Sequence, residues 1–465
     1  MRNTIEDPPQ PYHSSIVASE PFVNTRQGLG GRHSVAIQIN ARASDNSLDD
    51  VLLARLRDLV YKYASNNVYF TVLWKPYEDN LCTGIDLYNM YANLHEEANL
   101  KKIRAYYRTV YEIAYHLATL DKPFLTCLQG DVAGIGAGMA LSTTFPIATE
   151  SARVSLPGCR YGSLGAEGGA LFKFSRLPGR IGEYLMVSGK TLHSSDLVHV
   201  GLAQHFMPSD RSALLEARLA ESNSSELPAL LNAMDAFMDS PDETTIFKYF
   251  ESINRCFSKD TVQEIMQALR EETEHVEWAK NTLASMEKNS PLAMTITLKA
   301  TRIGRYLPLR NCLNLEYAIM SRLVQHPEYS EGISAHVEMR SPNWTYMKPE
   351  RVPEKEAEAF LAPLPIRKTL RLEKIHPGCD RIDAASEVAR FTPRLGFQSK
   401  SDISDQYGGP FADLPDILTW AHSELVKPAG LHSYYTLLNK EDEELESIED
   451  LKYQEITEIN HSTEG

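Results

Sequence analysis

The sequence predicts an α/β fold in which short strands alternate with helices, followed by a helical region. Two observations carry this prediction. Between residues 33 and 156, short apolar segments with strand-like alternation are separated by longer segments with helical periodicity. From Gly179 onward the pattern is almost wholly helical. Strands that alternate with helices typically form right-handed βαβ units around a parallel sheet, so we expect a spiral of such units.

The elements of the first half are expected in a regular order. Ser47 is placed to cap the first helix, and Lys122-Pro123 ends the second. Gly134 opens a short helix that glycine allows to pack closely. The expected strands are 33–40, 68–74, 124–128 and 145–156, and the expected helices are 48–65, 100–120 and 134–141.

The second half adds helices and changes character near its end. The expected helices are 180–188, 194–199, 212–220, 227–238, 242–254, 259–269, 272–287, 292–305 and 310–325. The predicted domains are an extended N-terminal arm (1–33), a βαβ spiral core (34–210), a helical part of the same domain (211–350), a C-terminal extension (351–438) and an acidic tail (439–465).

Composition excludes several classes of protein. The chain has 465 residues and a net charge of −15, so its average field does not attract nucleic acid. Its six cysteines are scattered without a Cys-x-x-Cys pair, which argues against a disulfide framework or a zinc site and suits a reducing compartment. No segment is apolar for long enough to span a bilayer, so we expect no membrane contact. The first residues form neither a signal core nor a clear transit peptide.

Charge is distributed unevenly near the C-terminus. Residues 366–400 carry eight basic and four acidic side chains, whereas residues 439–465 carry two lysines and ten acidic side chains. The basic stretch is the candidate contact with RNA or a neighbouring protein, and an ordinary solvated surface explains it equally well. The candidate contact residues are Arg367, Lys368, Arg371, Lys374, Arg390 and Arg394.

Four motifs occur in a fixed order over some 300 residues. They are Asn80-Leu-Cys-Thr-Gly-Ile-Asp-Leu87, Lys122-Pro123 followed by Gly130-Asp-Val-Ala-Gly-Ile-Gly-Ala-Gly138, Pro157 to Gly169, and Tyr329-Ser-Glu-Gly-Ile-Ser-Ala335. Together they resemble the motifs of the crotonase superfamily and, within it, of the 3-hydroxyisobutyryl-CoA hydrolases. The resemblance implies a ClpP/crotonase-like spiral fold for residues of about 34–350.

The resemblance also implies where catalytic groups would lie. In the family, two backbone N–H groups stabilise the thioester oxyanion, and these positions match Ile85 and Ile135, whose side chains we expect to crowd the acyl tunnel. The two catalytic carboxylates match Gly158 and Ala166, which cannot titrate. Glu167 lies one position later, and we expect it to be an acid on the surface or in a helix first turn rather than a substitute.

The residues that handle phosphate are altered too. Two family arginines become Leu87 and Ser334, and Arg160 and Arg340 are possible replacements. Asp131, like Glu167, is a carboxylate near these motifs that matches no catalytic position of the family. We expect Asp86 to cap a helix. No cluster of histidine, cysteine and aspartate has metal-ligand spacing, so no metal or other cofactor is expected.

The leading prediction is therefore a relative without catalytic activity that serves as a structural component. A hydrolase-like subunit of this kind exists in the small subunit of some mitochondrial ribosomes, which implies mitochondrial location and ribosomal protein partners, with rRNA contact through residues 366–400. Two alternatives stay open. One is an active acyl-CoA thioesterase or hydratase with relocated acid/base residues, and the other is a protein that binds CoA without converting it, although the lost arginines argue against a CoA site.

Overall fold

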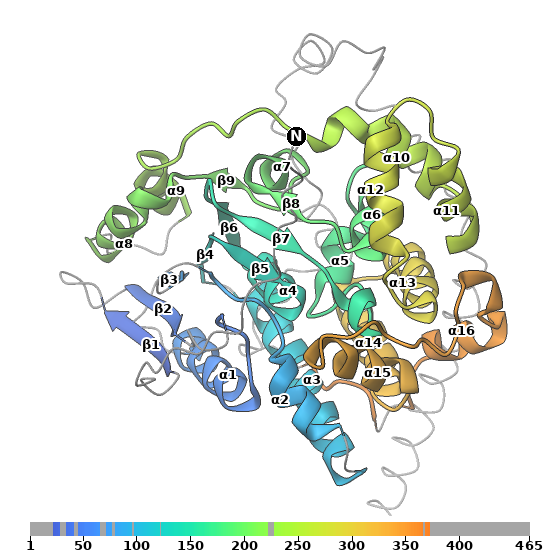
Figure 1. The fold of residues 1–465 in the computed structure, drawn as a ribbon. Coiled ribbons are helices and arrows are strands. Elements are labelled where there is room, and N and C mark those ends of the chain that lie inside the picture. The colour runs from blue at the N-terminus through green and yellow to red at the C-terminus, as the bar shows by residue number, and fades with distance from the viewer. Residues whose placement is uncertain are drawn as a thin grey trace, which may run out of the picture.

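The computed structural model describes residues 22–27, 34–40, 45–65, 71–76, 80–94, 97–120, 122–221, 227–365 and 368–372. Two sheets and many helices make up this part (Figure 1). The strands are β1 (Phe22–Gln27), β2 (Ser34–Asn40), β3 (Thr71–Trp74), β4 (Phe124–Leu128), β5 (Asp131–Ala133), β6 (Phe145–Ala148), β7 (Arg153–Ser155), β8 (Leu192–His193) and β9 (His205–Phe206).

The helices lie between and after these strands and agree with the predicted α/β class. They are α1 (Asp50–Ser65), α2 (Leu87–Asn93), α3 (Glu97–Thr119), α4 (Gly134–Leu141), α5 (Ala170–Phe174), α6 (Ile181–Ser188), α7 (Ser194–His199), α8 (Ser212–Glu221), α9 (Leu227–Asp235), α10 (Phe250–Phe257), α11 (Val262–Arg270), α12 (Val276–Met286), α13 (Pro291–Gly304), α14 (Leu309–Leu323), α15 (Pro327–Val337) and α16 (Glu354–Leu361). Short 3₁₀ turns are η2 (Gly158–Tyr161), η3 (Ser209–Arg211), η4 (Ile246–Tyr249) and η5 (Pro349–Arg351).

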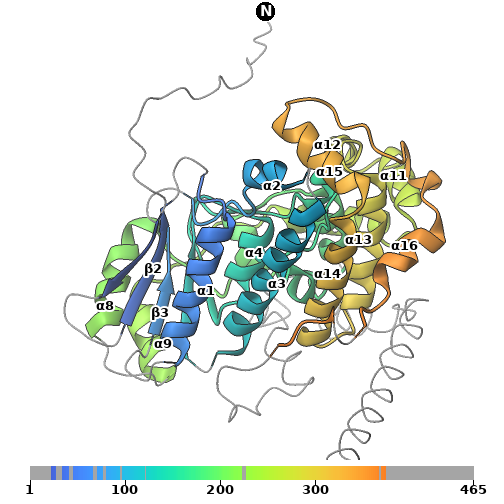
Figure 2. The ribbon, with the colours of Figure 1, turned by 90° about the horizontal axis from the view of Figure 1, so that it is seen from below.

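The larger sheet has the strand order β1-β2-β3-β4-β6-β9. Strands β2, β3, β4, β6 and β9 pair in parallel, and β1 adds to the edge antiparallel. Helices α1, α3 and α4 lie to one side of this sheet and α8 and α9 to the other (Figure 2). A separate apolar cluster under α8 and α9, which includes Leu73, Ile147 and Leu219, confirms that both faces are buried, as a parallel sheet requires.

The single strand expected over 145–156 is wrong, because the chain turns at residues 149–152 and forms two strands in different sheets. Strand β6 stays in the larger sheet, whereas β7 pairs with β5 and β8 in the second sheet. The Thr149 hydroxyl donates to the Leu128 carbonyl oxygen and the Arg153 N–H to the Gly130 carbonyl oxygen, which fixes the turn. This second sheet carries the chain into the site described below.

Two further details differ from the sequence-based expectation. The first helix is capped by Asp49, whose carboxylate accepts from the Leu52 N–H at 2.7 Å, rather than by Ser47. The predicted N-terminal arm, 1–33, includes β1, which pairs with β2 over six residue pairs, and its other residues lie outside the described part. The composition of the arm gives no alternation that would have revealed this strand.

The glycines of the second motif let α4 approach its neighbours closely, as expected from their size. A Cβ atom on Gly136 would lie 2.6 Å from the Cys82 sulfur, and one on Gly138 would lie 2.5 Å from the Gly168 carbonyl oxygen. Real Cβ atoms do not come this close, so alanine at either position would push these segments apart. Glycine here brings three of the four motifs together.

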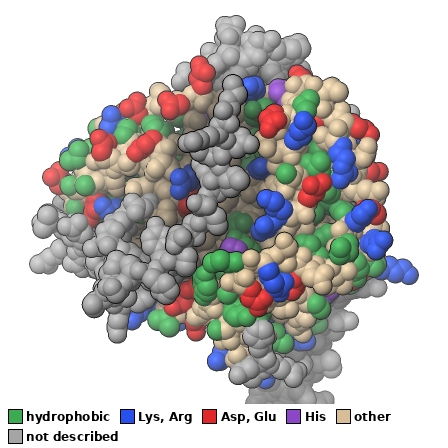
Figure 3. All heavy atoms as spheres, viewed as in Figure 1, with side chains coloured by type: hydrophobic (Ala, Val, Ile, Leu, Met, Phe, Trp, Pro, Cys, Tyr) green, Lys and Arg blue, Asp and Glu red, His purple; other side chains and the backbone are tan. Residues whose placement is uncertain are grey.

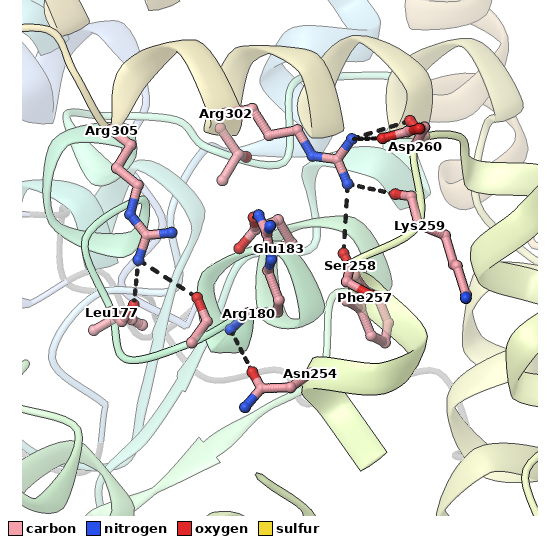
Figure 4. A network of polar contacts seen from close by, with 12 residues as sticks. Leu177, Arg180, Glu183, Asn254, Phe257, Ser258, Lys259, Asp260, Arg302 and Arg305 are labelled. Carbon is pink, nitrogen blue, oxygen red and sulfur yellow. Dashed lines mark hydrogen bonds and ion pairs between the residues drawn. The ribbon is translucent and has the colours of Figure 1, made fainter. Parts of the chain in front are cut away.

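Two half-buried arginines tie the helical half of the molecule to the core (Figure 4). Arg302 and Arg305, both at the end of α13, donate to backbone carbonyl oxygens, among them that of Phe257 at the end of α10, at 3.4 Å, and that of Leu177 in the loop after α5, at 3.2 Å. Glu183 of α6 lies between them and pairs with Arg180 at 2.7 Å. Because these carbonyl groups have no helical partner, guanidinium donors satisfy them without solvent.

The packed body extends beyond the boundary predicted at residue 350. Helix α16 packs on α13 and α14, and Leu370 and Leu372 are buried. The Leu370 N–H donates to the Asn314 side chain at 3.0 Å, and Arg310 donates to the Leu372 carbonyl oxygen at 2.8 Å. Residues 373–465, which include most of the predicted extension and the acidic tail, lie outside the described residues.

Searching the described helices for a membrane span finds no candidate of sufficient length and apolarity. The five described cysteines, Cys82, Cys127, Cys159, Cys256 and Cys312, are buried, and none of them forms a disulfide bond within the described part of the chain.

Candidate functional site

The four motifs meet around one pocket of about 360 Å³. Its wall comes from the loop before α2, the start of α4, the turn η2 and the first half of α15, with Tyr107 of α3 behind them. The lining residues are Thr83, Ile85, Leu87, Tyr107, Asp131, Ala133, Gly134, Ser155, Pro157, Gly158, Tyr161, Ser163, Glu167, Tyr329 and Ile333. Residues 246 positions apart in the chain, Thr83 and Tyr329, therefore share one cavity.

The position that matches the first catalytic carboxylate cannot hold a side chain. Gly158 is buried, and a Cβ atom there would lie 2.7 Å from the Leu164 carbonyl carbon and closer still to its oxygen. Ala166, at the position of the second carboxylate, is fully buried. A Cβ atom on the preceding residue, Gly165, would lie only 2.9 Å from the Thr297 methyl group. At Gly158 the backbone of Leu164 thus occupies the space that a side chain would need.

Glu167 does not lie on the surface, so that expectation is wrong. Its exposed fraction is 5%, it lines the pocket, and the Ser163 hydroxyl donates a hydrogen bond to it. Burial raises the pKa of Glu167 to about 7, and the Ser163 hydrogen bond opposes part of that rise. The turn of residues 162–169 points the side chain inward because α5 begins only at Ala170, so the helical rotation assumed from the sequence does not apply.

A buried carboxyl behind Glu167 holds this turn in place. Glu316 of α14 accepts hydrogen bonds from the N–H groups of Gly169 and Leu171, each at 2.9 Å. It thereby satisfies two of the free amides at the start of α5. Burial raises the pKa of Glu316 well above its usual range. Sequence reasoning missed this residue, since its partners lie 145 and 147 positions away.

Tyrosines form the remaining polar wall of the pocket. The hydroxyl groups of Tyr107 and Tyr329 lie 3.2 Å apart, and Tyr161 packs edge-on against His336. Burial raises the pKa of Tyr107, Tyr161 and Tyr329, so all three stay neutral at physiological pH. The helical spacing of Tyr107 and Tyr111 was the available signal in the sequence, but tyrosines with that spacing usually belong to the core.

The two predicted oxyanion positions fall on adjoining turns but in different surroundings. The Leu48 N–H donates to the Gly84 carbonyl oxygen, and the Asp86 N–H donates to the Leu48 carbonyl oxygen. The N–H of Ile85, between them, therefore faces away from Leu48. The Ile85 side chain lines the pocket. The Ile135 N–H lies in the first turn of α4, where no helical acceptor exists. The Ile135 side chain is fully buried and is not among the lining residues. Contrary to the expectation, it therefore does not crowd the pocket.

The possible substitutes for acid/base and phosphate-binding groups are engaged elsewhere. Asp131 lines the pocket but forms two hydrogen bonds with Arg153, at 2.7 and 3.0 Å. Arg340 pairs with Glu331 at 2.5 Å and with Glu338 at 2.6 Å, so it is not free to bind phosphate. Arg160 is exposed. Asp86 caps α2 by accepting from the Asn89 N–H at 2.9 Å, as predicted.

Two of the six candidate RNA contacts lie among the described residues. Lys368 and Arg371 are exposed on the segment that follows α16, whereas Arg367, Lys374, Arg390 and Arg394 lie outside the described residues. One group of potential metal ligands, Glu272, Glu274 and His275, does come together within the described part, which the sequence did not indicate. Arg255 pairs with Glu272 at 2.8 Å and with Glu274 at 3.3 Å, so one guanidinium already offsets part of the charge of the two carboxylates.

Comparison with known proteins agrees with this architecture. The sequence pattern of the enoyl-CoA hydratase/isomerase family matches residues 34–361. The chain belongs to this family. The chain is 29% identical to "Small ribosomal subunit protein mS47" of Arabidopsis thaliana over 72% of this chain and 83% of that protein. It is 30% identical to "Probable 3-hydroxyisobutyryl-CoA hydrolase 3" of the same organism, over 70% of this chain and 88% of that protein.

A solved structure shows the same fold. The crystal structure of a carnitinyl-CoA dehydratase from Mycobacterium thermoresistibile covers 77% of this chain, with a TM-score of 0.68 and 22% identity. At this identity the likeness establishes the crotonase fold alone. The predicted spiral of βαβ units followed by helices is confirmed.

Proposed function

We propose that this member of the family is a catalytically inactive, hydrolase-like component of the small subunit of the mitochondrial ribosome. The observation that carries the proposal is the closed turn at Gly158, where the family's first catalytic carboxylate would lie and where no side chain fits. A fold that keeps its close glycine contacts, but has backbone in the place of the first catalytic carboxylate and alanine in the place of the second, retains the family's shape without its acid/base groups. The similarity to a protein named as a small ribosomal subunit component supports the ribosomal half of the proposal.

The distribution of charge favours protein neighbours over extensive RNA contact. On the face shown in Figure 3, acidic and basic side chains of the described residues are interspersed rather than separated by sign. With a net charge of −15, the chain as a whole is repelled by RNA unless a local basic segment meets it. We therefore place the protein at the periphery of the particle, with ribosomal proteins as its main partners and residues 366–400 as the segment that would meet rRNA.

A second candidate function rests on Glu167. A carboxyl with a pKa of about 7 in a pocket is suited to acid/base work, so an acyl-CoA hydrolase with a relocated base is the alternative. Against it stands the lack of a second free carboxylate among the described lining residues, since Asp131 is held by Arg153.

Two experiments test the proposal. The first compares hydrolysis of 3-hydroxyisobutyryl-CoA by the purified chain and by its Glu167→Gln variant. We expect no turnover above background from either, and turnover that Glu167→Gln abolishes would establish the alternative function. The second isolates tagged protein from mitochondria and identifies what accompanies it, for which we expect small-subunit ribosomal proteins in near-equal amounts.

A further inference from the structure

The described lining of the pocket is acidic and carries no basic side chain. The family it belongs to is named for chemistry on CoA thioesters, whose reaction develops negative charge. Here, none of the lining residues is lysine or arginine, and two of them, Asp131 and Glu167, are acidic. Asp131 is neutralised by Arg153, so Glu167 alone sets the charge of the pocket.

Glu167 has hydrogen-bonding capacity that the protein does not fill. Its one described partner is the Ser163 hydroxyl, which donates to a single carboxylate oxygen. No hydrogen bond from the described residues reaches the second oxygen, which is not among their fully buried unpartnered atoms, so it is accessible from the pocket that Glu167 lines. A largely desolvated, ionised carboxylate is stabilised by a donor or a positive charge that meets it. The pocket gives such a group access to Glu167.

The rest of the wall fits the body of an organic cation. Ile85, Leu87 and Ile333 give the pocket an apolar side. Tyrosines 107, 161 and 329 supply aromatic surface and hydroxyl oxygens, both of which attract ammonium groups. A volume of about 360 Å³ is at the small end of ligand pockets and suits a short alkyl chain.

We propose that this pocket binds a primary ammonium group on a short alkyl chain, with the Glu167 carboxylate as its anionic partner. A lysine side chain of a neighbouring protein and a free small amine share this chemistry. The proposal does not depend on the ribosomal assignment, because it concerns the isolated chain.

The test is calorimetric titration of the full-length chain at pH 8 with three ligands of equal length: n-butylammonium, n-butanol and butyrate. We expect butylammonium to bind about tenfold more tightly than butanol, and butyrate not to bind, because a charge-assisted hydrogen bond forms only with the cation. Equal affinity for the three ligands, or preference for butyrate, would overturn the proposal even without a variant.

Two variants locate the binding group. Glu167→Gln keeps the side-chain volume and is expected to weaken butylammonium binding about tenfold. Glu358→Gln is the matched control, since it removes an exposed carboxylate of α16 that does not line the pocket, and it should leave the affinity within about twofold. A variant Glu167→Gln that folds, by circular dichroism, and binds like the wild type contradicts the proposal.

The pH dependence gives a readout that a merely structural role would not move. Affinity should rise between pH 6 and 8 as Glu167 ionises, and the rise should vanish in Glu167→Gln. The titratable groups that influence Glu167 from the elements around it are Tyr106, Tyr107 and Tyr111 of α3, Cys159 and Tyr161 of η2, Glu316 of α14 and Tyr329 of α15. A pH dependence that survives in Glu167→Gln would assign the binding to another of these groups and refute the proposal.

The source of the ammonium group is distinguished by Nα-acetyl-lysine methylamide, which presents lysine within a peptide-like backbone. Binding comparable to butylammonium identifies a lysine side chain of a partner, and binding of butylammonium alone identifies a free amine. Both results require the ammonium site, and binding of neither ligand at millimolar concentration refutes it.

Discussion

Adding one methyl group at Gly158 probes the closure of the old catalytic position. In Gly158→Ala the new carbon would lie 2.7 Å from the Leu164 carbonyl carbon, whereas carbon atoms normally rest about 3.5–4 Å apart. The turn must therefore move by about 1 Å. It is held by a hydrogen bond from the Ser163 N–H to the Gly158 carbonyl oxygen at 2.9 Å and by one from the Gly165 N–H to Thr297 at 2.9 Å.

Because the turn cannot relax freely, we expect Gly158→Ala to lower the free energy of unfolding by about 3 kcal/mol, the upper part of the range for overpacking. Urea denaturation followed by circular dichroism measures this change. The control is Gly134→Ala, where a Cβ atom meets nothing within 4 Å and only the left-handed backbone (φ 50°) costs about 1 kcal/mol. If Gly158→Ala costs no more than the control, the turn is not closed as described.

Three further predictions concern the core and the site. Lys75→Ala should destabilise the protein by about 3 kcal/mol in urea denaturation, because it leaves Glu216 unpaired in a largely buried bridge of 2.5 Å, and Lys75→Met with Glu216→Leu should recover most of this loss. Glu167→Gln should be as stable as the wild type below pH 5 but more stable by up to about 3 kcal/mol at pH 8. The reason is that the raised pKa of the Glu167 carboxyl makes the wild type lose stability as pH rises from 4.5 to about 7. Equal stability of the two proteins at both pH values contradicts this. The double change Gly158→Glu and Ala166→Asp should not restore hydrolysis of 3-hydroxyisobutyryl-CoA, because the backbone of the turn occupies the space of the first carboxylate, and measurable turnover would show that the site can reopen.

The sequence pattern predicted the helices and strands whose limits are set by neighbouring residues in the chain. Helix α4 begins and ends where expected, at Gly134 and Leu141. The parallel strands also follow from short apolar segments between helices. The strand expected over 145–156 failed because β6 and β7 follow each other closely in the sequence, and only their partners in two different sheets separate them.

The sequence predicted which catalytic groups are missing from the candidate site, but not which polar side chains line it. The absence of carboxylates at Gly158 and Ala166 is visible in the sequence. The inward direction of Glu167 is not, because Glu316 and the start of α15 fix the turn from more than 140 positions away. Likewise, nothing local predicts that Tyr107 and Tyr329, 222 positions apart, lie side by side. Such features depend on tertiary contacts that a single sequence does not display.

The most direct test of the account is the sedimentation of the endogenous protein in a mitochondrial lysate on a sucrose gradient. The account predicts that the protein migrates with the small ribosomal subunit and stays with it at moderate salt, as expected for contacts made mainly with proteins. Migration as a free small oligomer, separate from every ribosomal particle, would contradict the proposed function.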